Sequence, residues 1–155
     1  YQKGAWVLHM LRNYVGEDNF REGIRTYYKK YYNSNTTTEE FKKEMEFVSG
    51  IDLDFFFDQW LYNGGNIILD GGWTYDEKKR RVEVNLNQVQ DDGYIFQMPL
   101  ELGIYYEDEN LFKLETVKLE KEKGRFYIAT DTKPKNIKID PYTKLLALWD
   151  FNEIK

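Results

Sequence analysis

The spacing of apolar residues along the chain changes near residue 65. Before that point apolar side chains recur every three or four residues, as on one face of an α-helix. After it they alternate with polar residues in short runs separated by turn signals, as in half-buried β-strands. The sequence therefore predicts an α+β chain with an all-α helical lobe at 1–65 and an antiparallel β-sandwich at 66–155.

About four helices are expected in the first part, the first of them covering Gln2 to Val15. Thr37 and Glu40 have the spacing of a capping box at the start of the third helix. Asp52 is the expected N-cap of the fourth, whose strongly apolar sequence predicts a central place in the helical core. The predicted apolar stripes are Ala5, Leu8, Leu11 and Val15; Phe20, Ile24, Tyr27 and Tyr31; Phe41, Met45 and Val48; and Leu53, Phe56, Phe57, Trp60 and Leu61.

About seven short strands are expected after the Gly-rich boundary at 63–66, with turn signals every 8 to 12 residues, a spacing typical of a sandwich. One of these strands has an irregular pattern. Phe112 and Leu114 are at even-numbered positions, whereas Val117 and Leu119 are at odd-numbered positions, so a regular strand would point the two pairs to opposite faces. This shift predicts a bulge or a bend within the strand.

Composition narrows the class of protein. The chain has 155 residues, of which 41% are hydrophobic and 17% aromatic, so it can bury a core. Its net charge of -5, from 22 basic and 27 acidic residues, argues against a nucleic-acid partner. No apolar run approaches the roughly 20 residues that span a bilayer. The absence of cysteine excludes a disulfide framework and cysteine chemistry.

The residue types offer no self-sufficient active site. His9 is the single histidine, so the chain cannot supply an HExxH zinc site, and we expect a structural or solvent-edge role for it. Ser34 and Ser49 are the only serines, and neither lies in a nucleophile elbow. The glycine pairs at 64–65 and 71–72 lack the spacing of a phosphate-binding loop.

Acidic residues gather at three places along the chain. Asp52, Asp54 and Asp58 surround an expected helix start, where carboxylates interact favourably with the helix dipole. The acidic residues at 91–92 and 107–109 fall in expected turns. Such turns could bind calcium through carboxylate oxygens, or they could simply be solvated.

Two further features also keep two interpretations. The tripeptide at 35–37 matches a glycosylation sequon, but its place before a helix favours a turn and a helix cap. Trp60, Trp73 and Trp149 could form ligand platforms, although aromatic residues at periodic positions usually belong to a core.

The first part contains an ordered series of motifs: YQKGAWVLHMLRNYVGEDNFREGIRTYYKKY, then NTTTEEF, then SGIDLDFFFDQWLYNGG. This series resembles the C-terminal lobe of the catalytic domain in aminopeptidase N-type zinc metallopeptidases, from Tyr1 to about Gly65. A β-sandwich domain comes next in that family, and KIDPYTKLLALWD resembles its last strand. Ile67 departs from the family, because many relatives have Pro there, and this alters only the start of the first strand.

The resemblance implies one catalytic residue in this chain. The Tyr of the family's Y-x-K-G motif donates a hydrogen bond to the oxyanion of the tetrahedral intermediate, and Tyr1 matches it. Lys3 and Gly4 would fix the local backbone. The zinc-binding HExxH helix, the third zinc ligand and the G-x-M-E-N loop that binds the substrate amine all precede this motif in the family. We therefore expect the chain to begin inside an active-site motif and to lack a zinc site of its own.

Three functions follow as hypotheses. The chain is a C-terminal fragment, itself inactive, of a zinc metalloaminopeptidase that hydrolyses N-terminal residues from peptides. Alternatively it is a non-catalytic scaffold of the same fold. The third hypothesis is an unrelated sandwich that binds sugar or protein, and exposed aromatic residues on one face of the sandwich would favour it. As a fragment it would expose an apolar surface, mainly on the first and fourth helices. The rest of the catalytic domain would cover that surface in the parent, and a fragment dimer could cover it otherwise.

Overall fold

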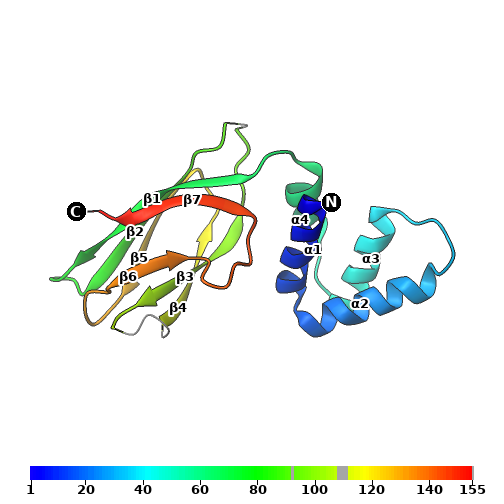
Figure 1. The fold of residues 1–155 in the computed structure, drawn as a ribbon, viewed down its shortest axis with the longest axis horizontal. Helices are drawn as coiled ribbons and strands as arrows, with labels where there is room; N and C mark the ends of the chain where they lie inside the picture. The colour runs from blue at the N-terminus through cyan, green and yellow to red at the C-terminus, as the bar shows by residue number, and fades with distance from the viewer. Residues whose placement is uncertain (92, 108–111, 155) are drawn as a thin grey trace. The chain divides into compact units, whose positions relative to one another are not determined.

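A computed structural model of the chain describes residues 1–91, 93–107 and 112–154. They form two compact units, Tyr1–Gly64 and Gly65–Lys155 (Figure 1). Helices make up the first unit and two β-sheets the second, so the predicted α+β class is confirmed. No helix in the described ranges is long and apolar enough to cross a membrane.

The helical unit has an α-helix at each of the four predicted places. Gly50 follows the third of them with φ of 68°, a left-handed conformation that glycine adopts without a side-chain penalty. The fourth continues directly as a short π-helix. The elements are α1 (Gln2–Val15), α2 (Glu17–Lys30), α3 (Thr38–Ser49), α4 (Asp54–Phe57) and the π-helix η1 (Asp58–Tyr62).

The apolar stripe predicted for α1 is half wrong. Ala5 and Leu8 are exposed, the latter to 43%. Apolar residues occur on two sides of this helix, and periodicity alone did not decide which side faces the core. The buried side chains of α1 are Val7, Met10, Leu11 and Val15.

Helices α2 and α3 pack closely through a glycine. A Cβ atom on Gly23 would lie 2.5 Å from the Sδ atom of Met45, which is fully buried on α3. Tyr27 of α2 meets Phe41 of α3 edge to face, with ring centroids 5.2 Å apart. Ile24, which was expected in the same buried face, is 39% exposed. The contact between the helices is therefore centred on Gly23 rather than on the whole predicted stripe.

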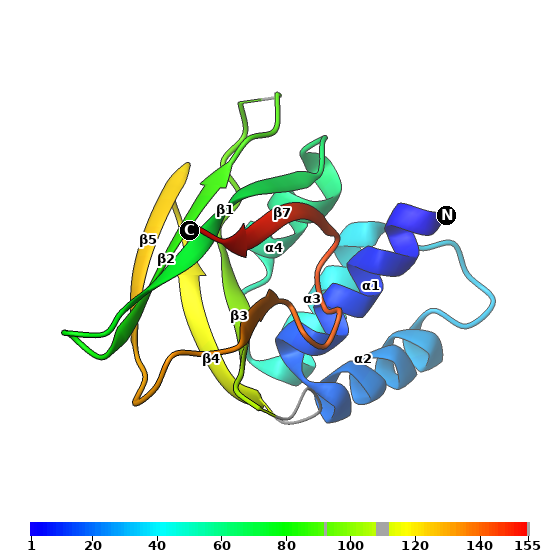
Figure 2. The same cartoon turned by 60° about the vertical axis from the view of Figure 1, so that its left-hand side comes forward.

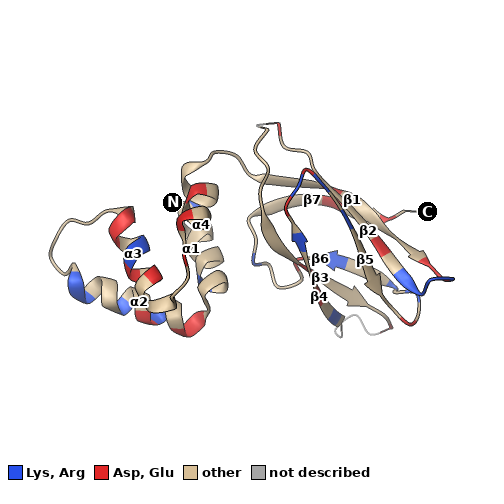
Figure 3. Cartoon of the chain, turned by 180° about the vertical axis from the view of Figure 1, so that it is seen from behind, with Lys and Arg blue, Asp and Glu red and all other residues tan. Residues whose placement is uncertain are grey.

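Charges along α2 follow the helix dipole. The first turn is acidic and the last turn basic (Figure 3), so each end carries the charge that the dipole favours. The carboxylate of Glu17 also pairs with Arg12 of α1 and with Arg21. These hydrogen bonds from the guanidinium groups, that from Arg12 first, lower the pKa of Glu17.

The fourth helix begins later than predicted. Its N-cap residue is Leu53, and the Asp52 carboxylate accepts a hydrogen bond of 2.9 Å from the backbone N–H of Asp54. Asp52, which we expected to be the N-cap, therefore supports the start of the helix from one position before the observed N-cap. The expected central apolar residues are otherwise confirmed, except that Leu61 is 38% exposed. The buried ones are Leu53, Phe56, Phe57 and Trp60.

The second unit consists of two sheets that face each other (Figures 1 and 2). One sheet has the strand order β5-β2-β1-β7 and the other β4-β3-β6. The pairing of β1 with β7 is parallel, which differs from the wholly antiparallel sandwich that we expected. The strands are β1 (Ile67–Asp76), β2 (Arg81–Gln88), β3 (Met98–Tyr105), β4 (Phe112–Leu119), β5 (Lys123–Ala129), β6 (Asn136–Ile139) and β7 (Ala147–Glu153).

The predicted bulge in β4 is wrong. The register between β4 and β3 runs without interruption from Leu119 to Phe112. Phe112 and Leu114 are apolar but lie on the outer face, where Phe112 stacks on Tyr105 with ring centroids 4.9 Å apart. Because Gly103 lies between these rings, an aromatic cross-strand pair covers the gap left by the glycine.

A buried amide joins the segments at one end of the sandwich. The Gln88 side chain accepts from the N–H of Phe96 at 3.0 Å and donates to its carbonyl at 2.8 Å. It also donates to the carbonyl of Lys121 at 3.1 Å. These bonds satisfy backbone groups that would otherwise be buried without partners, so they hold the chain before β3 in place.

Candidate functional site

Tyr1, the residue for which the sequence predicts catalysis, is the N-cap of α1. Its carbonyl oxygen accepts a hydrogen bond of 3.0 Å from the backbone N–H of Ala5, which is the first backbone hydrogen bond of the helix. Its side chain makes no capping bond and is fully exposed. The helix thus fixes the Tyr1 backbone, while the phenol O–H can reach a group outside the helical unit.

Part of the α1 surface near Tyr1 consists of small or apolar residues. Gly4, Ala5 and Leu8 are all exposed and lie within two helical turns of Tyr1. A Cβ atom on Gly4 would meet nothing within 4 Å, so packing among the described residues does not require glycine there. Positions 4 and 5 of α1 thus carry short side chains, whereas the exposed Gln2 and Lys3 beside Tyr1 are long and polar.

His9 makes contacts within α1. Its ring meets Trp6 edge to face, with centroids 5.4 Å apart, and its Nε2 atom lies 3.3 Å from the side-chain nitrogen of Asn13. The imidazole is half-buried. These contacts fit the structural or solvent-edge role that we expected.

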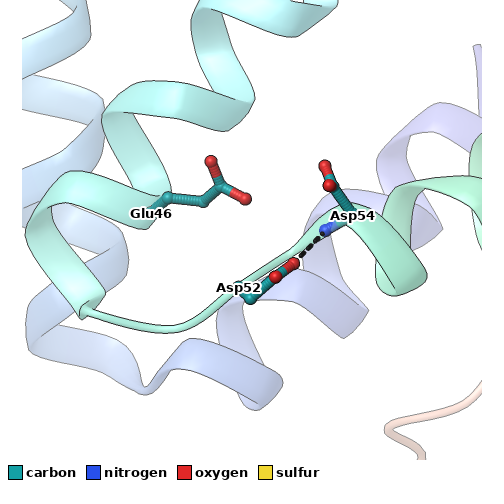
Figure 4. A group of neighbouring side chains, drawn as sticks. All are labelled: Glu46, Asp52 and Asp54. Atoms are coloured by element: carbon teal, nitrogen blue, oxygen red, sulfur yellow. Dashed lines mark hydrogen bonds between the residues drawn. The ribbon is translucent and has the colours of Figure 1, made fainter.

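Three carboxylates converge where α3 leads into α4 (Figure 4). Oxygens of Glu46, Asp52 and Asp54 lie within 4.8 Å of one another, and this is the one such group found in the described part of the chain. From closeness along the chain, the sequence analysis grouped Asp58, not Glu46, with Asp52 and Asp54. Glu46 is distant from the others in the sequence, and only the turn between the two helices brings it close.

Each carboxylate of this group already has a partner. Glu46 accepts 2.9 Å from the backbone N–H of Leu53, and Asp52 accepts 2.9 Å from that of Asp54. The Asp54 carboxylate accepts from the ammonium of Lys42 at 2.5 Å. Hydrogen bonds from Lys42 to Asp54 and then to Glu39 raise its pKa, which keeps the positive charge beside the cluster. The cluster thus holds the turn between α3 and α4 together.

The candidate aromatic platforms do not share a surface. Trp60 and Trp73 are buried, at 6% and 1% exposure, and belong to the cores of their units. Trp149 is 40% exposed on the edge strand β7. Tyr127 and Tyr142 are also exposed, but Tyr127 lies on the outer face of β5 while Tyr142 stacks on Phe112 of the other sheet. No single face therefore gathers the exposed aromatic rings of the described residues.

The remaining candidates lie in loops. Asn35 is exposed between α2 and α3, and Thr37 forms the capping box at the start of α3, as predicted. The acidic turn at 91–92 is described only at its first residue, and that at 107–109 only at Glu107. The calcium alternative for these two turns therefore falls largely outside the described residues.

Comparison with known proteins supplies a family. Residues 1–60 match the sequence model of the "Peptidase family M1 domain". Probable aminopeptidase 2 of Sulfurisphaera tokodaii is 30% identical over 142 residues, which cover 90% of this chain and 17% of that protein. Aminopeptidase N of Escherichia coli is 30% identical over 88 residues, covering 57% of this chain and 10% of that protein.

A solved structure shares the fold over the whole chain. The crystal structure of Legionella pneumophila aminopeptidase A in complex with aspartic acid superposes with a TM-score of 0.77 at 18% identity, covering 100% of this chain and 18% of that one. This chain thus spans less than a fifth of the length of each of these relatives. Through residues 1–60, which carry the Tyr1 motif, the chain belongs to the peptidase M1 family of aminopeptidases.

Proposed function

We propose that this chain is part of a zinc-dependent metalloaminopeptidase that hydrolyses N-terminal residues from peptides. The observation that carries this proposal is the family match over residues 1–60, which begins at Tyr1. In the proposed enzyme Tyr1 donates a hydrogen bond to the oxygen that becomes negatively charged in the tetrahedral transition state. Its exposed phenol at the start of α1 supports that role.

The proposed role of Tyr1 is to stabilise charge that exists only near the transition state. A hydrogen-bond donor aimed at a developing oxyanion typically contributes about 10²–10³ in kcat. Such a donor needs a fixed origin and an unobstructed path to the reacting carbonyl. The helix N-terminus supplies the first, and the full exposure of the Tyr1 side chain supports the second.

The residues of this chain do not fit the family's zinc site. Catalytic zinc takes three protein ligands, most often from His, Glu, Asp or Cys. The chain has one histidine and no cysteine. In the described part of the chain, the carboxylates of Glu46, Asp52 and Asp54 already bind backbone N–H groups and Lys42. We therefore assign no zinc-dependent step to this chain and propose that the ligands and the general base belong to another part of the protein.

We also propose that the rest of the catalytic domain packs on the helical unit. The unit exposes many large apolar side chains, and exposed apolar surface often marks a site of protein–protein contact. As expected, α1 and the α4–η1 segment contribute to this surface, but Phe47 of α3 is the most exposed of these side chains after Tyr1, at 81%. The others include Leu8, Tyr14, Phe55, Leu61 and Tyr62.

The test compares the parent polypeptide with the 155-residue chain. Determining the coding sequence that precedes Tyr1 shows whether an HExxH motif is intact there, as the enzyme requires, or degenerate, as a scaffold would allow. Both proteins are then assayed with aminoacyl reporter substrates, with and without a metal chelator. We expect chelator-sensitive cleavage by the parent and none by the chain. Chelator-sensitive cleavage by the chain alone, or no cleavage by the parent, would overturn the proposal.

A further inference from the structure

Asn63 closes the end of the helical unit with both its main chain and its side chain. Its backbone N–H and its side-chain Nδ2 donate to the same carbonyl oxygen, that of Asp58, at 2.9 and 2.7 Å. The first bond spans five residues and completes η1. The second brings another donor to that carbonyl at the end of the helix, so the Asn63 side chain acts as a C-terminal cap. Asn63 then leaves the helix in an extended conformation, with φ of -80° and ψ of 142°.

The residue after Asn63 offers its backbone nitrogen with little hindrance. Gly64 is exposed, and a Cβ atom placed on it would meet nothing within 4 Å. Glycine also gives its own backbone the widest range of conformations. Asn63-Gly64 is the only Asn-Gly pair in the sequence. Every other asparagine is followed by a residue whose side chain hinders its backbone nitrogen more than glycine does.

We propose that Asn63 is a site of spontaneous deamidation. The Gly64 nitrogen loses its proton to solvent and attacks Cγ of Asn63, which forms an N–Cγ bond and a five-membered succinimide. The Cγ–Nδ2 bond breaks, and the amide nitrogen takes up a proton and leaves as ammonia. Water then opens the ring at one of its two carbonyls and gives aspartate or isoaspartate. Only water is consumed, and the modification is independent of the proposed peptidase function.

The product loses the contact that Asn63 makes in the folded chain. A carboxylate cannot donate to the Asp58 carbonyl, and it places negative charge at the negative end of a helix. Isoaspartate further adds one methylene to the main chain beside the boundary between the two units, which lies between Gly64 and Gly65. We therefore expect deamidation to loosen the last turn of η1 and to lengthen the connection.

The cap also sets the pace of the reaction. The hydrogen bond from Nδ2 to the Asp58 carbonyl must break before the Asn63 side chain can turn toward the Gly64 nitrogen. Local opening of a helix end costs far less than global unfolding, so the reaction proceeds from the folded chain. We expect it to be faster still in urea, where the cap is absent.

The test incubates the 155-residue chain in neutral buffer and follows each asparagine by peptide mass spectrometry and isoaspartate detection. We expect conversion at position 63 to exceed that at every other asparagine by at least about tenfold. Asn33-Ser34 and Asn35-Thr36 serve as internal controls in exposed loops. Conversion at either control that equals or exceeds that at Asn63 would overturn the proposal.

Two variants separate the chemistry from its structural effect. Gly64→Ala should slow conversion of Asn63 by at least about tenfold, because a methyl group hinders the attacking nitrogen. An unchanged rate in this variant would exclude attack by the residue 64 nitrogen. Asn63→Asp should speed hydrogen exchange of the amides in η1 while those of α2 stay unchanged. Unchanged exchange in η1 would show that the side chain does not cap this helix.

Discussion

Thr37 and Glu40 each complete the other's hydrogen bonds at the start of α3. The Glu40 N–H donates to the Thr37 hydroxyl at 3.3 Å, and the Thr37 N–H donates to the Glu40 carboxylate at 2.7 Å. The hydroxyl of Thr36 donates to the same carboxylate at 3.0 Å. The bonds that the carboxylate accepts, that from the Thr37 backbone first, lower the pKa of Glu40. Both residues therefore stabilise a helix whose first N–H groups have no partner within the helix.

Replacing Thr37 by alanine should destabilise the helical unit. The change removes the oxygen that accepts from the Glu40 N–H, and loss of such a cap typically lowers the free energy of unfolding by about 0.5–2 kcal/mol. Urea unfolding followed by circular dichroism measures the effect. Thr38→Ala is the matched control, because Thr38 is exposed and is the next residue of the same sequence. Equal losses in the two variants would contradict the capping role.

The lowered pKa of Glu40 predicts a pH dependence. A carboxyl group whose pKa is lower in the folded than in the unfolded chain stabilises the fold at neutral pH. That contribution is lost as pH falls through the folded-state pKa. The difference in free energy of unfolding between the wild-type chain and E40Q should therefore shrink as pH is lowered from neutral into the acidic range. A difference that stays constant would show that the charge of Glu40 does not matter.

Sequence analysis predicted single-residue contacts where the partners are close along the chain. Thr37 and Glu40 are three residues apart, so the helix rule that joins them is visible in the sequence. Glu46 joins Asp52 and Asp54 only because a turn folds α4 back toward the end of α3. Residue spacing does not give the direction of that turn, and so the sequence groups Asp58, not Glu46, with Asp52 and Asp54.

Two glycines in neighbouring helices have opposite surroundings. Gly23 faces Met45, and an added Cβ would lie 2.5 Å from its sulfur, whereas a Cβ on Gly4 would meet nothing. Gly23 therefore sets how closely α2 approaches α3. Gly4 has no comparable packing role among the described residues.

Alanine at these two positions should change stability in opposite directions. Gly23→Ala must displace the sulfur of the buried Met45, and we expect this overpacking, typically about 1–3 kcal/mol, to outweigh the gain of about 1 kcal/mol that alanine brings to a helix. Gly4→Ala should stabilise the chain by up to about 0.5–1 kcal/mol, because alanine restricts the unfolded chain and favours helix. Thermal or urea unfolding of both variants checks the signs. If Gly23→Ala were as stable as Gly4→Ala, the close packing of α2 on α3 would be wrong.

Element types were predicted more reliably than the faces of elements. The bounds of α1 match the prediction, yet Ala5 and Leu8 are exposed because the helix has apolar residues on two sides. The strand β4 was expected to bulge because Phe112 and Leu114 are apolar. They are instead outward-facing, and Phe112 stacks on Tyr105 over Gly103. Periodicity locates an element, but its neighbours in space decide which face is buried.

At the scale of the whole molecule, the chain joins a helical unit to a seven-stranded sandwich. Composition and the change of period predicted this class. The parallel pairing of β7 with β1 was not predictable, because pairing between distant strands is not encoded in local alternation. The family came from the ordered motif series at 1–65. The proposed role of Tyr1 depends on zinc ligands and a general base that we assign to another part of the protein.

The central claim is that Tyr1 is the oxyanion donor of a metalloaminopeptidase, and Tyr1→Phe in the parent enzyme tests it most directly. Removing the hydroxyl leaves the ring in place, so we expect kcat to fall by about 10²–10³ with little change in KM or in bound zinc. Tyr28→Phe is the control, since Tyr28 is an exposed tyrosine of α2 that we place neither in the site nor in the proposed packing surface, and it should retain full activity. A kcat for Tyr1→Phe equal to that of the unmodified enzyme would contradict the claim.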